Sequence, residues 1–294
     1  MKCLLKFKIE KNCAKYRKKK SKQKLSNKNL NYLQFSKVCF FFIFLKLFVE
    51  GLNFTFTKEK SFLFQVQSHA NEITIKIQGT GDQYAVSENF YKCPDSIYLN
   101  TDLISPKGDN CKIINIPSGG ETINTVKLKW NNKLISLKGM FIGFNHLKEA
   151  DLSNFDCSSV SLMTDMFFNC STVTSINFTN LDTSFVKDMR SVFYECESLT
   201  ELNLSSFDTS KVTAMSFMFK GCRNLRSLNI ESFKTSQVET MEALFADLYV
   251  LENLDVSHFD TSQVTDMGDM FCNCKSLKKL DLSSFNASNV LSMG

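Results

Sequence analysis

Apolar residues return at fixed positions every 26 residues over the second half of the chain. The period contains no insertion or deletion and defines six units, of which the third reads LTELNLSSFDTSKVTAMSFMFKGCRN. A constant period of about 20–50 residues is typical of solenoids, because a single unit cannot bury its own apolar face and stacked units share one core. The units begin at Leu147, Val173, Leu199, Leu225, Leu251 and Leu277.

Each unit opens with a short alternating segment. Counted from the first residue of a unit, repeat positions 4 and 6 are apolar, with Asp or Asn between them, as in Leu202, Asn203 and Leu204. This alternation predicts a strand with one buried face. Position 10 is mostly Asp and position 12 is always Ser. Such side chains bond nearby backbone, which predicts a turn that leads into a helical turn.

The second half of the unit has a helical spacing. Val at position 14, Met at position 17 and an aliphatic–Phe pair at positions 20 and 21 are three or four residues apart, which places them on one helical face. An alternative interpretation is that the Met and Phe columns line a binding site for a cofactor or a hydrophobic ligand. A core formed by stacking accounts for them without any cofactor, and we expect none.

Position 24 is cysteine in four units: Cys170, Cys196, Cys222 and Cys274. Metal binding or a disulfide ladder is one interpretation. Leu248 replaces the cysteine in the fourth unit, and no histidine accompanies the column. We therefore interpret the column as small buried hydrophobes that carry a thiol, and we expect no metal site. Cys157, which stands where other units have Thr, is predicted to be more exposed than this column.

The repeated pattern LxxLxLSxFDTSxVTxMxxMFxxCxx resembles the BspA-like leucine-rich-repeat surface proteins. The likeness is to the branch catalogued as a domain of unknown function, found in bacterial surface lipoproteins and in protist surface proteins. It covers residues 147–294, and a degenerate earlier unit keeps the register at Met140 and Phe141. The resemblance implies a leucine-rich-repeat solenoid, an extracellular location, adhesion or partner binding, and no catalytic residues.

Ahead of the repeats, four segments alternate as half-exposed strands do, between turns rich in Gly and Pro. They are residues 73–79, 96–100, 111–116 and 125–130. The expected fold is therefore a repeat solenoid of leucine-rich-repeat type over residues 140–294, with a short strand and a short helix per unit, preceded by a small β-rich N-terminal cap domain over residues 52–139. The last unit stops eight residues short, so we expect a truncated or fragmentary array.

Residues 1–51 form a basic N-terminus followed by an apolar run. Residues 1–37 carry a net charge of +12, which leaves −7 for the remainder of a chain whose total is +5. The run VCFFFIFLKLFV at residues 38–49 is too short for a membrane span but suits the apolar core of a signal peptide, with cleavage after Gly51. A retained signal anchor, a buried strand and a spurious extension are the alternatives, and the head alone suits a basic targeting arm.

Two modifications follow if the chain is exported. Cys93 and Cys111 flank a turn-rich stretch and are the expected disulfide pair in an oxidising compartment. Asn53 is the N-glycosylation sequon that we expect to be modified first.

The sequence offers no catalytic constellation. Its three histidines follow no column, and we read them as surface residues; no phosphate loop, nucleophile elbow or metal motif is present. The Asp column at position 10 suggests a calcium ladder, but Lys234 and Asn286 interrupt it, and turn chemistry explains it. We expect a protein that is not an enzyme.

Repeat positions 3, 5 and 7 are polar and mildly acidic, and the predicted strands place them on one open face. As a binding face they suit an extracellular protein or glycan partner, in particular a basic or glycan-bearing one; plain solvation of a strand is the alternative. Nucleic acid is not an expected partner, and a membrane is one only if residues 38–49 remain as an anchor. The candidate residues are Glu149, Asp151, Asn177, Glu201, Asn203, Asn229, Asn253, Asp255 and Asp281.

The expected function is thus adhesion or binding by a secreted or cell-surface protein. A structural surface-coat component is the rival hypothesis. A cytoplasmic repeat scaffold is the third, and it applies if the N-terminus is not a signal peptide.

Overall fold

The computed structural model describes residues 71–105, 113–117 and 123–293. The chain from His69 onward forms one compact unit. In the described residues every regular element is a β-strand. The strands are β1 (Glu72–Gln78), β2 (Gly81–Tyr84), β3 (Ser96–Leu99), β4 (Asp102–Ile104), β5 (Ile113–Ile116), β6 (Ile123–Lys129), β7 (Leu147–Asp151), β8 (Ser175–Asn177), β9 (Glu201–Asn203) and β10 (Ser227–Asn229).

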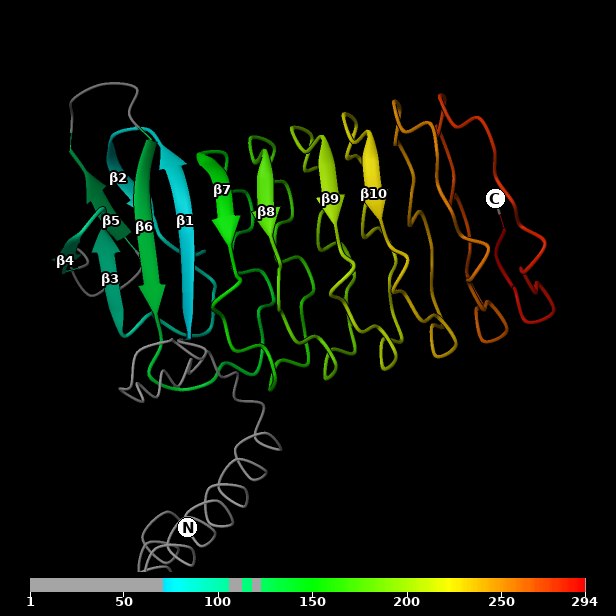
Figure 1. Ribbon diagram of the computed structural model, residues 1–294, viewed down its shortest axis with the longest axis horizontal. Helices are drawn as coiled ribbons and strands as arrows, with labels where there is room; N and C mark the ends of the chain where they lie inside the picture. The colour runs from blue at the N-terminus through cyan, green and yellow to red at the C-terminus, as the bar shows by residue number, and fades with distance from the viewer. Residues whose placement is uncertain (1–70, 106–112, 118–122, 294) are drawn as a thin grey trace, which may run out of the picture. The chain divides into compact units, whose positions relative to one another are not determined.

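The strands form one large mixed sheet and two small ones. The six-stranded sheet has the order β4-β3-β6-β1-β7-β8, while β9 pairs with β10 and β2 pairs with β5. Strand β1 is antiparallel to β6 and β7, whereas β7 is parallel to β8. Figure 1 shows β7 to β10 side by side, with the remaining units following toward the C-terminus. The β-rich segment and the first repeats therefore share one sheet.

The four strands predicted ahead of the repeats occur as β1, β3, β5 and β6, each within a few residues of its predicted bounds. Their alternation is visible in burial, since Ile73, Ile75 and Ile77 of β1 are buried between half-exposed neighbours. Strands β2 and β4 were not predicted. The sequence of β2, GDQY, has no apolar alternation, and β4 is only three residues long.

The prediction of a leucine-rich-repeat solenoid with a strand and a helix in each unit is wrong. The described residues contain no helix, and the sheets are mixed and do not close into one continuous wall. A short strand is present in the first four units, as β7 to β10, and in the last two it is reduced to an isolated bridge between Asn253 and Lys279. The segment that was predicted to be helical is a series of turns whose backbone bonds to neighbouring units.

Hydrogen bonds show why no helix forms in this segment. In the first unit the N–H groups of Met163, Asp165 and Phe167 donate to carbonyls one unit further on, at 2.9, 3.0 and 2.9 Å. The intervening N–H groups close turns instead, as Met166 does onto the Met163 carbonyl at 3.1 Å. A helix would need N–H groups bonded four residues back along the same segment. Here alternate N–H groups of the segment donate to the neighbouring unit instead.

Backbone conformation gives the same result. Repeat positions 19 and 23 have positive φ in each of the first five units, for example 57° at Asp165 and 55° at Asn169. An α-helix requires φ near −63°. A left-handed residue every four positions reverses the chain and still returns Met163, Phe167 and Cys170 to the core side. The spacing of three and four residues therefore predicted the buried side chains correctly, but the helical backbone that it also predicted is absent.

Identical residues lie above one another in the core. The rings at repeat position 21 stack at centroid distances of 5.3 to 6.0 Å. This column is Phe141, Phe167, Phe193, Phe219, Phe245 and Phe271. The interpretation of the Phe and Met columns as a stacked core is confirmed, because these side chains are buried in the first four units.

A threonine column at repeat position 11 ties the units together. The hydroxyl of Thr209 donates to the Lys234 carbonyl at 2.9 Å and accepts from the Lys234 N–H at 2.7 Å. Thr183 and Thr235 bond the next unit in the same way. Cys157 replaces threonine in the first unit and is 1% exposed, so the prediction that it is more exposed than the Cys column is wrong.

Replacing Cys157 with threonine is expected to stabilise the protein. No described residue accepts a hydrogen bond from the Asp182 N–H, which is the group that a threonine at position 157 would reach. Because the two side chains have similar size, the gain is about 1 kcal/mol in free energy of unfolding. Denaturant unfolding measures it, and an unchanged or lower midpoint would contradict the role given to this column.

His146 joins the β-rich segment to the first unit. Its Nε2 lies 3.2 Å from the Tyr84 carbonyl, and its own carbonyl accepts from the Gln78 N–H at 2.9 Å. Burial lowers the pKa of this imidazole, although the Tyr84 carbonyl acts in the opposite direction. The folded protein therefore resists protonation of His146.

Stability is expected to fall as the pH drops from about 7.5 to 5.5. The unfolded chain binds a proton at its usual pKa near 6.5 while folded His146 does not, so acid favours unfolding. Urea midpoints at the two pH values measure the loss. His146→Gln should reduce the pH dependence; a pH dependence that stays unchanged in this variant would refute the assignment.

Candidate functional site

The polar sheet face of the repeats consists of the side chains at repeat positions 3, 5 and 7. In β9 the buried Leu202 lies between exposed Glu201 and Asn203, and β8 repeats this pattern around Ile176. Because side chains alternate across a strand, burial of position 4 turns positions 3 and 5 outward together. The structure thus brings all nine predicted residues to one face.

Six of these nine residues, those at repeat position 5, serve the turn that follows the strand. In each unit the side-chain oxygen at position 5 accepts the N–H of position 7, at 2.9 to 3.1 Å. This is the local bond that Asn and Asp make in turns. The residues are Asp151, Asn177, Asn203, Asn229, Asp255 and Asp281.

Two carboxyl groups of this column, those of Asp255 and Asp281, have a lowered pKa that favours the charged form. The Ser257 hydroxyl and N–H lower the pKa of Asp255, and the Ser283 N–H and hydroxyl lower that of Asp281. The Nδ2 group of Asn177 also donates to Asp151 of the unit before it, at 3.0 Å. Position 5 therefore has a structural task, whatever else it contacts.

The other three residues lie at repeat position 3. Glu149 forms an ion pair with Lys76 of β1 at 2.7 Å. Glu201 and Asn253 are exposed, and no other described residue forms a hydrogen bond or an ion pair with either side chain. Glu231, at position 7, is likewise exposed without a side-chain partner among the described residues. Glu201, Asn253 and Glu231 are thus the side chains of this face that the fold leaves available.

The polar sheet face continues onto strands β1 and β6, which the sequence reasoning did not include. Lys127 and Lys129 pair with Glu72 at 2.8 and 2.9 Å, and Lys76 lies beside Glu149. Burial acts to raise the pKa of Glu72, but the two lysines outweigh it and lower the value. The alternation of β1 and β6 marked these residues as outward; their place beside the repeats depends on strand order, which no local pattern encodes.

The Asp column at repeat position 10 forms turns. Asp182, Asp208 and Asp260 each accept the N–H of the serine two residues on, at 3.0 Å. Across the described ranges, no three His, Cys, Asp or Glu side chains come close enough together to hold a metal ion.

The cysteines at repeat position 24 point into the core. Their thiols donate to carbonyls of the preceding unit at 2.9 to 3.2 Å, and all four are free. Burial raises the pKa of Cys170 and Cys222 to about 12, so neither carries a nucleophilic thiolate. These are structural groups, as the interpretation of buried hydrophobes predicted.

Several expectations fall on the remaining parts of the chain. Asn53, residues 1–51 and the predicted signal segment lie outside the described residues. Cys93 is disulfide-bonded, whereas Cys111 lies outside the described residues, so their pairing stays a prediction. No helix among the described residues is long and apolar enough to cross a membrane.

Comparison with protein families places the repeats in one of known sequence pattern but undescribed function. The sequence model of a family described as Mycoplasma protein of unknown function, DUF285, matches residues 118–227 and 198–294. The two matches together cover more than half of the chain, including all six repeat units. No curated protein and no solved structure matches this sequence.

Proposed function

We propose, from the premise that this chain belongs to the family described as Mycoplasma protein of unknown function, DUF285, that it is a non-enzymatic binding protein. Its polar sheet face recognises a protein or glycan outside the cell, on the cell surface or in the medium. The likeness of its repeats to BspA-like surface proteins supports this location and this style of function. Adhesion is the activity that we assign to it.

One observation carries the proposal: some side chains of the polar sheet face form hydrogen bonds within the fold, whereas others are exposed and have no partner among the described residues. Position 5 is used by the turns in all six units, whereas Glu201, Glu231 and Asn253 at positions 3 and 7 are exposed without a partner in the described part of the chain. A stack of units with a common core holds these groups at a regular spacing, which favours recognition of an extended partner.

The charge on this face indicates the chemistry of the partner. Glu201, Glu231 and Asp255 make the repeat portion acidic, while Lys76 and Lys127 make the β-rich portion basic. A basic protein surface pairs with the acidic portion. A glycan hydroxyl, which both donates and accepts, suits carboxylate and amide groups alike.

Cys93 supports export. A disulfide persists in oxidising compartments and is rare in the cytosol of ordinary cells. A mature chain that begins near residue 52, identified by peptide mapping of protein from its own cells, would agree with the proposed location. A chain that keeps residues 1–51 with every thiol free would contradict it.

The proposed face is tested with arrays of glycans and of basic peptides. The double variant Glu201→Lys, Glu231→Lys should lose binding by at least about tenfold, because its new charges repel a basic partner and remove acceptors for a glycan. Glu239→Lys, Glu242→Lys makes the same change in charge at positions 15 and 18, away from the sheet, and should bind as the unaltered protein does. Equal binding by both variants would rule out the polar sheet face.

A further inference from the structure

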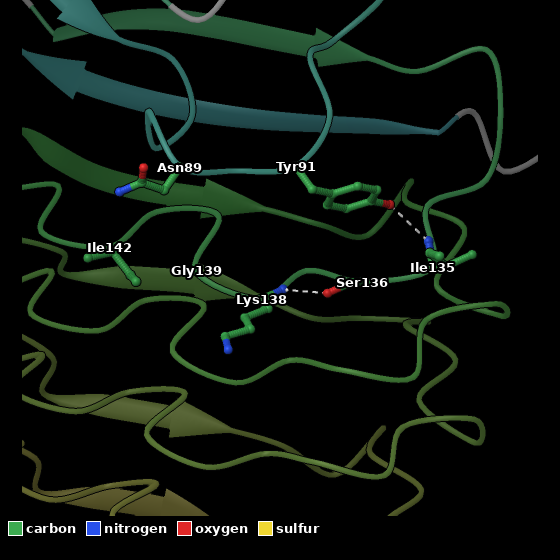
Figure 2. A pocket seen from close by; sticks show the side chains of 7 residues that line it. All are labelled: Asn89, Tyr91, Ile135, Ser136, Lys138, Gly139 and Ile142. Atoms are coloured by element: carbon green, nitrogen blue, oxygen red, sulfur yellow. Dashed lines mark hydrogen bonds between the residues drawn. The ribbon is translucent and has the colours of Figure 1, made fainter.

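A pocket of about 340 Å³ lies beside the edge of the first turn of the repeat array, on the side that faces the loop after β2. Figure 2 shows Tyr91 from this loop pointing toward Ile135, with Ile142 at the other end of the pocket below Asn89. These three apolar side chains are 52%, 64% and 43% exposed. The loop is attached to this edge by two bonds, from Ser87 N–H to the Met140 carbonyl at 2.7 Å and from Ile135 N–H to the Tyr91 hydroxyl at 3.1 Å.

The edge beside the pocket differs from the corresponding part of every later unit. In the first full unit, carbonyls at repeat positions 16, 18 and 22 accept N–H groups from the turn before, as Thr164 does from Gly139 at 2.9 Å. The equivalent carbonyls at the edge belong to Ser136, Lys138 and Ile142. No described residue donates a hydrogen bond to any of the three.

The N–H groups of the same segment are used elsewhere. Lys138 donates to its neighbour Ser136 Oγ at 3.1 Å, and Ile142 donates to the Gly139 carbonyl at 3.4 Å. With Ile135 bonded to Tyr91, the edge offers acceptors and few donors. Carbonyl oxygens without a hydrogen-bond donor carry a partial negative charge, which favours a cation that donates hydrogen bonds. A matching ligand is therefore cationic and rich in donors.

Gly139 keeps the pocket open. Its φ is +63°, and a Cβ on it would lie 2.9 Å from Ile142 Cδ1. The same repeat position carries a side chain in later units, such as Asp165 and Phe217. The glycine thus removes the group that elsewhere occupies this space.

Lys138 does not fill the pocket. Figure 2 shows its side chain extending away from Tyr91. Burial raises the pKa of the Asp165 carboxyl in the next unit, and the Lys138 ammonium opposes that rise, which places its charge beside Asp165. Lys138 lines the pocket, but its ammonium is directed to Asp165, so Tyr91 and the two isoleucines stay exposed beside the edge carbonyls.

We infer that this pocket binds a guanidinium group, which stacks on the Tyr91 ring and donates to the edge carbonyls. Guanidinium is planar, has five N–H donors and no acceptor, and packs on aromatic faces. Its weak hydration suits walls made of isoleucine. Arginine side chains of a partner and small guanidine compounds share this chemistry.

The test uses the full chain, amide NMR and three blocked amino acids of similar size: acetyl-arginine, acetyl-lysine and acetyl-citrulline methylamides. The arginine probe should shift the amides of residues 135–143 saturably, in the millimolar range expected for one small group. The citrulline probe, which is neutral, and the lysine probe, which lacks the planar fork, should bind at least about tenfold more weakly. Free arginine is compared with the blocked form: tighter binding of free arginine indicates a site for small guanidine compounds, and tighter binding of the blocked form indicates a site for arginine side chains of a partner.

Ile135→Lys should weaken binding of the arginine probe at least about tenfold, because it sets a like charge at the rim of the pocket. Thr213→Lys is the matched control, since it adds the same charge at the same repeat position three units on. Gly139→Asn, which keeps a residue tolerant of positive φ but fills the pocket, should also abolish binding. Absence of a saturable shift, or equal binding of arginine and citrulline probes, would overturn the inference; equal binding of the lysine probe would overturn the preference for guanidinium.

Discussion

Replacing Phe193 with alanine is expected to lower the free energy of unfolding by about 3–5 kcal/mol. The ring is fully buried in the middle of the stacked column, and its centroid lies 6.0 Å from that of Phe167 and 5.8 Å from that of Phe219. Its edge also meets Phe178 at 5.8 Å. Removal leaves a cavity between two units that neighbouring rings cannot fill, because each is held by its own unit.

The matched control for this substitution is Phe185→Ala in the same unit. Phe185 is 54% exposed, and its main contact is the Lys211 ammonium, 4.1 Å from the ring centroid. Its loss should cost less than about 1 kcal/mol. Denaturant unfolding of both variants measures the difference. Similar midpoints would mean that the column does not hold the units together.

Thr209→Val should destabilise the protein by about 2–4 kcal/mol, although it barely changes the volume of the side chain. The hydroxyl pairs with both the N–H and the carbonyl of Lys234, and the site is fully buried. Valine leaves both backbone groups without a partner, so their desolvation is uncompensated.

Thr213→Val supplies the control for this second substitution. Thr213 is exposed, and its hydroxyl reaches the Lys187 carbonyl at only 3.4 Å. Its replacement should change the free energy of unfolding by less than about 0.5 kcal/mol. A loss at Thr209 no greater than that at Thr213 would show that the threonine column is not the bond between units.

The sequence predicted which side chains are buried far better than it predicted the backbone. Met163, Phe167 and Cys170 are core residues, as their spacing required. That spacing does not distinguish a helix from turns with left-handed residues at positions 19 and 23. Asn169 and Gly221 are residues that tolerate positive φ, but Ser191, Phe217 and Ala243 gave no such signal. The choice between a helix and these turns depends on the hydrogen bonds between units, which the sequence of one unit does not reveal.

The candidate site shows the same division. The sheet face was predictable, because alternation in a strand needs no knowledge of neighbours. Residue type did not predict that the side chain at position 5 accepts the turn bond while the side chain at position 3 does not, since Asn203 and Asn253 have the same chemistry. The acceptor edge near Tyr91 depends on which loop covers the first turn of the array, and no repeat pattern extends that far.

The measurement that tests the proposed function most directly is site-specific photo-crosslinking on the native cell surface. A photoreactive side chain replaces Glu201 on the polar sheet face or, as the control, Glu239 at position 15. We expect a discrete adduct from the Glu201 site that the Glu239 site does not give. Adducts from Glu239 alone, or the same adducts from both sites, would contradict recognition through the polar sheet face.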